Sequence, residues 1–505
     1  MSSESHIGSR ITRNAIMLYL RMAIAIIIGL YTSRIVLEQL GITDFGIYGV
    51  VGSIIALTEF INSALSNSFS RFFAYHLGQN NKSSREKTFT AANIISIIAA
   101  LIIILLGKTI GLWYFSNYIE IPLERIEVAK FTYNCCVICA ALRVIQLPFS
   151  SCLIAHEKMG AFAYIEILNS ILRLGAAIYL TLHSLDKLEI YSTLILVVTL
   201  TIFVCYYFYC RIIFKHIKYT PYPFPKDTLI QMSKFSILDL YGTICYSTRP
   251  HGTALLLNSF FGVALNAANS IALSIQHILN GISSNIIMAF SPQIIKKHSA
   301  NATKQMLELI SKATRYTFLL YLIVAIPLLI ETEQILLIWL GNNIPQYATT
   351  FCQLTIISTG LAIPINILNI CIHATGKIKF LSIGIGSMYL ITLPIIYFGF
   401  RYGLNPNYAY IIYIAIMCAI ILMTLLNVKH LIQEFKLTSY FRNAILPIIL
   451  VLVTSISTSL ISLQFTSCSI ITLSVSAFST LFGIFFLGLD SCERNTIINK
   501  IKIRR

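Results

Sequence analysis

Charged side chains are scarce in this sequence. Asp, Glu, Lys and Arg make up only 11% of its 505 residues, whereas 56% of the residues are hydrophobic. About a quarter of a typical soluble domain is charged, and the mean hydropathy here is +0.77. The composition therefore excludes an ordinary soluble protein and predicts a polytopic membrane protein built entirely from α-helices.

Patterns that indicate a metal site or an enzyme are also lacking. The twelve cysteines lie almost entirely in apolar stretches, and the group Cys135, Cys136 and Cys139 has no second cysteine pair. We interpret these cysteines as small buried hydrophobic residues. The expected outer loops are short and contain no His, and no nucleophile–base pair stands out. We therefore predict no metal, no cofactor and no enzymatic activity.

Long apolar stretches are abundant, and a helical span needs about 20 such residues. They predict fourteen transmembrane helices, near residues 14–36, 46–66, 89–112, 128–154, 161–183, 190–210, 235–258, 265–290, 313–330, 349–371, 381–400, 409–428, 444–463 and 470–488. The first stretch follows a short polar N-terminus and is too long for a signal-peptide core, so we expect an uncleaved span.

The basic residues are distributed unevenly between the two sides of this topology. If the N-terminus is cytoplasmic, 26 of the 37 Lys and Arg residues fall in inner segments, and three (Arg125, Lys187 and Arg401) fall in outer loops. This asymmetry follows the positive-inside rule and predicts that both termini are cytoplasmic. The net charge of +17 is then mostly a topology signal that also meets anionic lipid headgroups, and we expect no nucleic-acid partner.

Two halves of the chain share a sequence of features. Tyr31-Thr32-Ser33-Arg34 ends the first span, Tyr246-Ser247-Thr248-Arg249 lies late in the seventh, and each is followed by a Phe-Gly pair, Phe45-Gly46 and Phe261-Gly262. We predict two pseudo-symmetric six-helix lobes, with a boundary at a proline-containing linker between the sixth and seventh spans. The predicted domains are 1–220, 221–440 and 441–505, the last holding two appended spans and a basic cytoplasmic tail.

Arginines lie inside the predicted spans, where a charge is expensive and usually functional. The candidate binding residues are Arg21, Arg34, Arg143, Arg173 and Arg249. They outnumber the three acids inside the predicted spans, Glu59, Glu166 and Asp239. The surplus positive charge indicates an anionic ligand or water, and the guanidinium fork suits phosphate.

Structural explanations of these charges stay open. Glu166 and Arg173 are seven residues apart and are able to pair on one helix face. Alternatively, Glu59 or Asp239 neutralises Arg21 in a purely structural ion pair. Arg34 either extends to the lipid headgroups or pairs with Glu38.

Coupling to an ion would need a titrating group. Glu59 and Asp239 are the candidate carboxylates for H⁺ or Na⁺ coupling, and His277 is a further candidate for coupling or for a gate. Such a role for His277 competes with that of an ordinary core histidine.

The run Gly41-Ile42-Thr43-Asp44-Phe45-Gly46-Ile47-Tyr48-Gly49 and the fourteen spans resemble the bacterial polysaccharide flippases of the Wzx type. Those proteins share the MOP superfamily with the lipid II flippases and the multidrug and toxic compound extrusion (MATE) transporters. The resemblance implies that Arg21, Arg34 and Arg249 hold a pyrophosphate, whereas Arg143 and Arg173 are assigned on chemistry alone. It also implies that the last two helices form a groove for a lipid tail.

The expected function is translocation of a polyprenyl-pyrophosphate-linked oligosaccharide from the inner to the outer leaflet of the bacterial cytoplasmic membrane. The cargo would serve synthesis of O-antigen lipopolysaccharide, capsule or exopolysaccharide, and the protein would act by alternating access as a monomer among membrane lipids. Alternatives are a MATE-type cation or drug antiporter, which should instead carry surplus carboxylates, and a membrane glycan polymerase or ligase, which should carry a long outer loop.

Overall fold

The computed structural model describes residues 2–56, 58–79, 82–113, 123–182, 186–214, 225–340, 344–465, 469–491 and 493–495. Throughout these ranges the ordered elements are helices, and no strand is present among them. The predicted all-α class is confirmed. The chain divides into two compact units, Met1–Thr243 and Ile244–Arg505, and the boundary lies within one long helix, α8 (Lys226–Phe261). The three predicted domains, which use other boundaries, stay a prediction.

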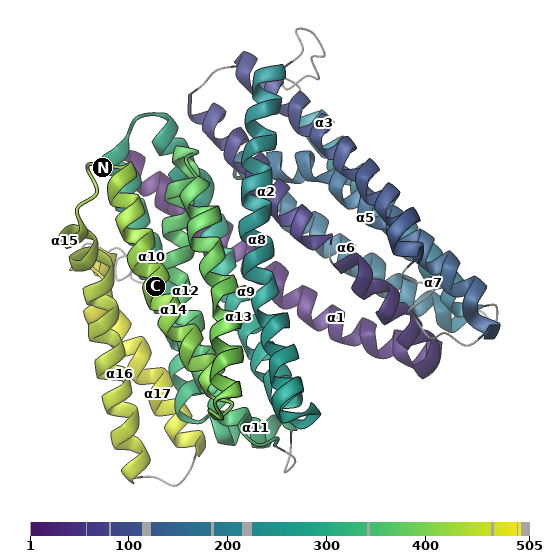
Figure 1. Cartoon of the computed structure of the whole chain (residues 1–505). Coiled ribbons are helices and arrows are strands. Elements are labelled where there is room, and N and C mark those ends of the chain that lie inside the picture. Colours follow the sequence, from purple (N-terminus) through teal and green to yellow (C-terminus); the bar gives the residue numbers. More distant parts are fainter. Residues whose placement is uncertain are drawn as a thin grey trace, which may run out of the picture. The chain divides into compact units, whose positions relative to one another are not determined.

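In the first unit, the described residues form several helices besides the start of α8 (Figure 1). They are α1 (Ser2–Ala56), α2 (Glu59–Gly78), α3 (Lys82–Leu106), α5 (Ile126–Ala155), α6 (Met159–Tyr179) and α7 (Lys187–Ile213). Helix α5 packs against α2, α3 and α7, and α1 packs against α6. Helix α5 buries side chains such as Tyr133, Ala140 and Leu153, and with its several neighbours it is the central helix of this unit.

The second unit holds the end of α8 and the remaining helices. They are α9 (Val263–Ser299), α10 (Thr303–Ile330), α11 (Thr332–Leu340), α12 (Ala348–Thr375), α13 (Gly386–Arg401), α14 (Tyr408–Leu431), α15 (Leu437–Tyr440), α16 (Leu446–Phe465) and α17 (Ser469–Gly483). Helix α12 packs against α9, α10 and α14, while α16 and α17 pair with each other and rest on α10. Short π-helical turns precede α13 and α16 and follow α17.

Twelve helices within the described residues are long and apolar enough to cross a membrane. The other two predicted spans are not among the twelve: 46–66 is divided between the end of α1 and the start of α2, and 235–258 lies within α8. Large apolar side chains such as Ile27, Leu182 and Phe478 are 69–74% exposed, which is the surface expected of a protein that faces lipid. The chain is a multi-pass membrane protein.

Small polar residues form the contact between α16 and α17. Ser455, Ser459, Ser476 and Thr480 are fully buried. The hydroxyl groups of Ser459 and Thr480 donate to the backbone carbonyls four residues earlier. Small residues of this kind allow close approach of membrane helices. The few polar residues of these two apolar helices are therefore buried rather than exposed to lipid.

Two glycines break the helices at corresponding points of the two units. Gly41 interrupts α1 with φ 72° and ψ 173°, and Gly262 separates α8 from α9 with φ 81° and ψ −177°. This backbone region is essentially reserved for glycine. The glycines therefore determine where the first and second helices of each half part from one another.

This correspondence bears on the expected equivalence of the two arginines. Arg34 lies seven residues before Gly41 (41 − 34), whereas Arg249 lies thirteen residues before Gly262 (262 − 249). The difference of six residues amounts to about 9 Å along a helix. The sequence comparison paired Gly262 with Gly46, which is not the residue at the break in α1. The equivalence of Arg34 and Arg249 stays a prediction.

Replacing Gly262 by Ala is expected to lower the free energy of unfolding by about 1–3 kcal/mol, because alanine is strained at this φ and ψ. No atom lies within 4 Å of the added Cβ, so the effect would come from the backbone alone. Gly175→Ala is the matched control, because Gly175 lies in a helix and also has open space around the added Cβ. This variant should have a free energy of unfolding about 0.5–1 kcal/mol higher than the wild type. Thermal unfolding of the purified protein measures both, and equal midpoints for the two variants would contradict the assignment.

An ion cluster anchors the second half of α1. Arg125 Nε donates to Asp44 Oδ1 at 2.9 Å, and Arg125 NH1 donates to Asp186 Oδ2 at 2.5 Å. Asp186 also caps α7, because Oδ1 accepts from the backbone N–H of Leu188 at 3.2 Å. The hydrogen bonds to Asp44 and then to Asp186 raise the pKa of Arg125 above its ordinary value. Part of the Gly41–Gly49 run is therefore held by the start of α5.

Candidate functional site

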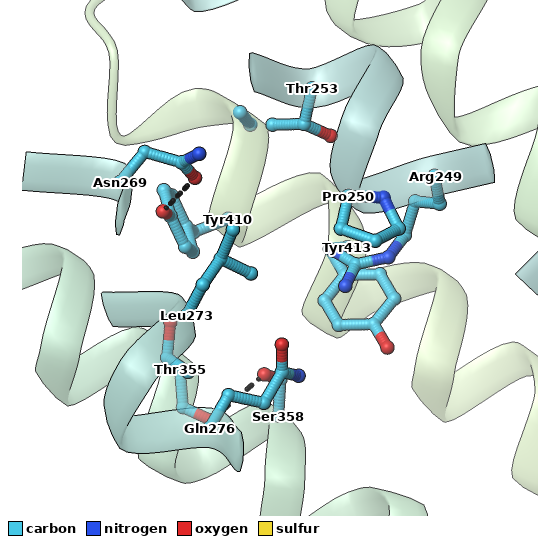
Figure 2. A pocket seen from close by; sticks show the side chains of 11 residues that line it. Arg249, Pro250, Thr253, Asn269, Leu273, Gln276, Thr355, Ser358, Tyr410 and Tyr413 are labelled. Atoms are coloured by element: carbon cyan, nitrogen blue, oxygen red, sulfur yellow. Dashed lines mark hydrogen bonds between the residues drawn. The ribbon is translucent and has the colours of Figure 1, made fainter. Parts of the chain in front are cut away.

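A small polar cavity lies inside the second unit around Arg249 (Figure 2). Its lining comes from four helices and includes Arg249, Pro250 and Thr253 of α8, Asn269, Leu273 and Gln276 of α9, Thr355 and Ser358 of α12, and Ala409, Tyr410 and Tyr413 of α14. The void has a volume of about 10 Å³, which is about the room that one water molecule needs. A larger ligand would need these helices to separate.

Arg249 is the charged group of this cavity. Only 7% of the residue is exposed, and its guanidinium carbon lies 3.6 Å from the centre of the Tyr413 ring. Its Nε has no hydrogen-bond partner in the described part of the chain, and no carboxylate of those residues pairs with it. A buried arginine without an acid is costly, so the cavity is built to hold positive charge.

Neutral polar groups surround this arginine. Thr253, one turn further along α8, is 5% exposed, and its hydroxyl has no partner among the described residues. Tyr410 donates its hydroxyl hydrogen to Asn269 Oδ1 at 2.7 Å, which leaves the amide group of Asn269 as a free donor toward the cavity (Figure 2). Gln276 lies two turns further along α9. The lining thus combines one fixed cation with hydrogen-bond donors, a combination that binds anions.

The local sequence explains why Arg249 sits here. Pro250 follows it within α8 and lacks an N–H group, so the carbonyl of Tyr246 loses its helical partner. Tyr410 and Tyr413 are three residues apart on one face of α14 and are both buried. Of the two, the ring of Tyr413 supplies the flat surface on which the guanidinium stacks.

The predicted arginines of the first unit are placed differently. Arg143 NH1 lies 3.4 Å from Glu59 Oε1, with both side chains well exposed. Arg173 Nε donates to Asn169 Oδ1 at 3.1 Å. The guanidinium carbon of Arg21 lies 5.4 Å from the centre of the Phe162 ring. These three belong to one unit, and each of these contacts is with a different partner.

The remaining predicted residues lie apart from the Arg249 cavity. Arg34 and His277 are exposed, and Asp239 is 7% exposed and accepts a hydrogen bond from Asn67 Nδ2 at 3.1 Å. The alternative pair of Glu166 with Arg173 is not formed, because Glu166 accepts from Tyr206 instead. Glu59 is occupied by Arg143 rather than by Arg21.

An apolar groove runs along the last two helices. It has a volume of about 870 Å³ and is lined by Thr454 and Thr458 of α16, and by Ser474, Val475, Phe478, Ser479, Phe482 and Gly483 of α17, followed by Phe486 and Leu487. The aromatic side chains on this face are largely exposed. The size and apolar lining of the groove suit an acyl or isoprenoid chain rather than a polar ligand.

Sequence reasoning missed Thr253, Tyr410 and Tyr413. A tyrosine pair spaced by three in an otherwise apolar stretch was the available signal for the ring under Arg249. Thr253 had no signal, because threonine is common in membrane helices and usually bonds its own backbone.

No family profile matches this sequence, and no curated protein is significantly similar to it. Solved structures do match. A multidrug resistance MATE family transporter of the MOP superfamily, in an outward-facing conformation, aligns with a TM-score of 0.66 at 14% identity, over 85% of this chain and 96% of that one. The VcmN MATE transporter of Vibrio cholerae, as an Asp-to-Asn variant, aligns with a TM-score of 0.72 at 14% identity, over 87% and 100%.

A third similar structure is a MOP superfamily transporter from Pyrococcus furiosus, for which a reverse polarity of the binding pocket suggests a different function. It aligns with a TM-score of 0.64 at 14% identity, over 84% of this chain and 96% of that one. At such low identity the likeness concerns the fold. This chain has the fold of MATE transporters of the MOP superfamily.

Proposed function

We propose that the protein translocates a polyprenyl-pyrophosphate-linked oligosaccharide across the bacterial cytoplasmic membrane, from the inner to the outer leaflet, by alternating access. Its cargo would feed synthesis of a surface polysaccharide such as O-antigen, capsule or exopolysaccharide. The transporter fold is compatible with this activity, and no covalent step is required of the protein.

The observation that carries the proposal is the unpaired, buried Arg249. A pyrophosphate supplies the negative charge that the described residues do not supply to this guanidinium. Arginine binds phosphate oxygens with two parallel hydrogen bonds, and Thr253 offers a further hydroxyl one turn away. The cavity would have to widen to admit the group, as expected of a transporter that changes conformation.

The groove on α16 and α17 supports a lipid-linked cargo. Its exposed aromatic wall would keep a polyprenyl chain in contact with the protein while the polar head is bound elsewhere. Burial of an isoprenoid chain on apolar side chains is favourable by roughly 25 cal/mol per Å² against water, but by little against lipid. The groove would therefore guide the chain rather than supply affinity.

Export of a cation or drug is the second candidate, and the likeness to multidrug transporters favours it. A site for organic cations needs carboxylates or open aromatic faces. None of the described residues that line the Arg249 cavity is acidic, and the face of Tyr413 already carries Arg249. The charge of the cavity therefore favours the anionic cargo.

Deleting the gene in its host separates these functions. The flippase predicts loss of a surface polysaccharide together with accumulation of its polyprenyl-linked precursor on the cytoplasmic side of the membrane. Re-expression of the wild-type protein should restore both, and re-expression of Arg249→Met should not. Unchanged polysaccharide with altered sensitivity to cationic drugs would move the protein to the antiporter class.

A further inference from the structure

Tyr410 is a buried tyrosine of the Arg249 cavity whose hydroxyl group serves another residue of the lining. It lies on α14, is 7% exposed, and donates its hydroxyl hydrogen to Asn269 Oδ1 on α9 at 2.7 Å (Figure 2). Asn269 is 3% exposed and lines the same void as Arg249. The bond therefore joins two helices directly at the cavity around the buried guanidinium.

From this geometry we propose that Asn269 is a second ligand of the pyrophosphate and that Tyr410 is the residue that positions it. The inference rests on the proposed function, because it concerns the same cavity and the same anionic group. It adds a neutral ligand from α9 to the cationic ligand that α8 supplies.

The hydrogen bond determines which part of the Asn269 side chain is left for a ligand. A carboxamide has one acceptor oxygen and two N–H donors. Tyr410 occupies the oxygen, and Nδ2 makes no hydrogen bond with another described residue. An ionised pyrophosphate that is esterified at both ends offers acceptor atoms only, so a free amide oxygen would repel it. Tyr410 covers the repelling atom and leaves the donors of Asn269 to the anion.

Tyr410 is itself held in place by an aromatic contact. Its ring stacks on that of Phe351 of α12, with the centroids 4.4 Å apart and the planes inclined by 31°. Phe351 is fully buried. The fixed ring keeps the hydroxyl group in position, so Asn269 is oriented before a ligand arrives. Such preorganisation lowers the entropic cost of binding.

One face of α14 therefore orients both ligands. Tyr410 and Tyr413 are three residues apart on that face. Tyr410 bonds Asn269 of α9, and Tyr413 carries the guanidinium of Arg249 of α8. We expect α9 and α14 to move together when the cavity widens, because the hydrogen bond between them keeps Asn269 oriented.

Binding of inorganic pyrophosphate to the protein in lipid nanodiscs tests the ligand role. Asn269→Ala is expected to weaken binding by about tenfold or more, because it deletes a hydrogen bond to a charged group. Asn427→Ala is the matched control, since this asparagine of α14 is 8% exposed and lies outside the described lining of the cavity. Its affinity should equal that of the wild type. Wild-type affinity in Asn269→Ala would overturn the proposal.

If Asn269→Ala does not fold, Asn269→Asp decides the question. The carboxylate has nearly the same size and still accepts from Tyr410, but it replaces the two donors by an acceptor and adds a negative charge to the cavity. Binding of pyrophosphate should then be lost. Unchanged affinity in this variant would also overturn the ligand role.

A double-mutant cycle separates positioning from a structural role of Tyr410. Tyr410→Phe should weaken binding by about fivefold, as the loss of one ordinary hydrogen bond implies. It should have no effect on affinity in Asn269→Ala, where no amide remains to be oriented. Tyr440→Phe, which removes a buried hydroxyl bonded to Thr314, is the control and should leave the affinity unchanged. A fivefold effect of Tyr410→Phe that persists in Asn269→Ala would overturn the positioning role.

The outcomes distinguish this inference from the proposed function. If Arg249→Met loses affinity while Asn269→Ala and Asn269→Asp keep it, the function stands and the inference fails. If the variants bind pyrophosphate as expected but the wild-type protein moves no lipid-linked oligosaccharide in proteoliposomes, the function fails and the two ligands stand. A wild-type protein that binds no pyrophosphate would refute both.

Discussion

Arg249→Met is expected to abolish transport and at the same time to stabilise the protein by about 1–3 kcal/mol. Methionine has a similar length and can cover the Tyr413 ring, but it carries no charge. The wild-type residue keeps a guanidinium 7% exposed without an acidic partner among the described residues. Insertion of such a charge costs roughly 2.5–3.5 kcal/mol, and a cost of this kind is retained only where function requires it.

Two measurements on one preparation check this prediction. Thermal unfolding in nanodiscs gives the change in stability, and binding of a soluble pyrophosphate-bearing analogue gives the change in affinity. Loss of the charge-assisted hydrogen bonds should weaken binding by about 10–150-fold, equivalent to 1.5–3 kcal/mol. The affinity of Arg249→Lys should lie between those of the wild type and Arg249→Met, because lysine keeps the positive charge but lacks the planar guanidinium. A destabilised Arg249→Met with unchanged affinity would show that the arginine is structural.

Arg315→Met should have the opposite effect on stability, lowering it by about 3–5 kcal/mol. Arg315 on α10 is 3% exposed and binds two carboxylates that follow α17, Asp490 at 3.0 Å and Glu493 at 2.6 Å. Tyr316 also donates its hydroxyl hydrogen to Glu493. Without Arg315, Glu493 would stay 20% exposed with no cation, whereas Asp490, at 65% exposed, would be solvated at little cost.

Thermal unfolding compares this variant with Arg249→Met directly, since the same substitution is made at two buried arginines. Adding Glu493→Gln to Arg315→Met should recover part of the loss, because it removes the stranded charge. An Arg315→Met protein as stable as the wild type would contradict the role of this ion cluster in holding the C-terminal segment to α10.

The all-α fold class could be predicted because the lipid bilayer imposes it on apolar segments. Backbone groups in lipid must be satisfied within one segment, so long apolar stretches become helices whatever their neighbours. The polar composition of α2 and α8 explains why those two helices do not reach the apolarity of the other spans. Positions of special backbone geometry were harder to predict, because Gly41 and Gly46 look alike in sequence and only Gly41 has the left-handed φ.

The partners of the charged groups could not be predicted, because pairing depends on helix rotation and depth. Sequence spacing allowed Glu166 to meet Arg173 on one helix face, yet Glu166 bonds Tyr206 on α7. Arg249 was identified from its cost in lipid, but the ring of Tyr413 beneath it lies 164 residues further along the chain (413 − 249). Contacts of this range are set by packing, which local patterns do not encode.

The most direct test of the account is a translocation assay in proteoliposomes with two cargoes that share one polyprenyl chain and one oligosaccharide. One cargo carries a pyrophosphate link and the other a monophosphate link. The account predicts that the wild-type protein moves the pyrophosphate form about tenfold or more faster, as the loss of one charge-assisted contact implies, and that Arg249→Met moves neither. Equal rates for the two cargoes, or normal transport by Arg249→Met, would contradict the claim that this buried arginine recognises the pyrophosphate.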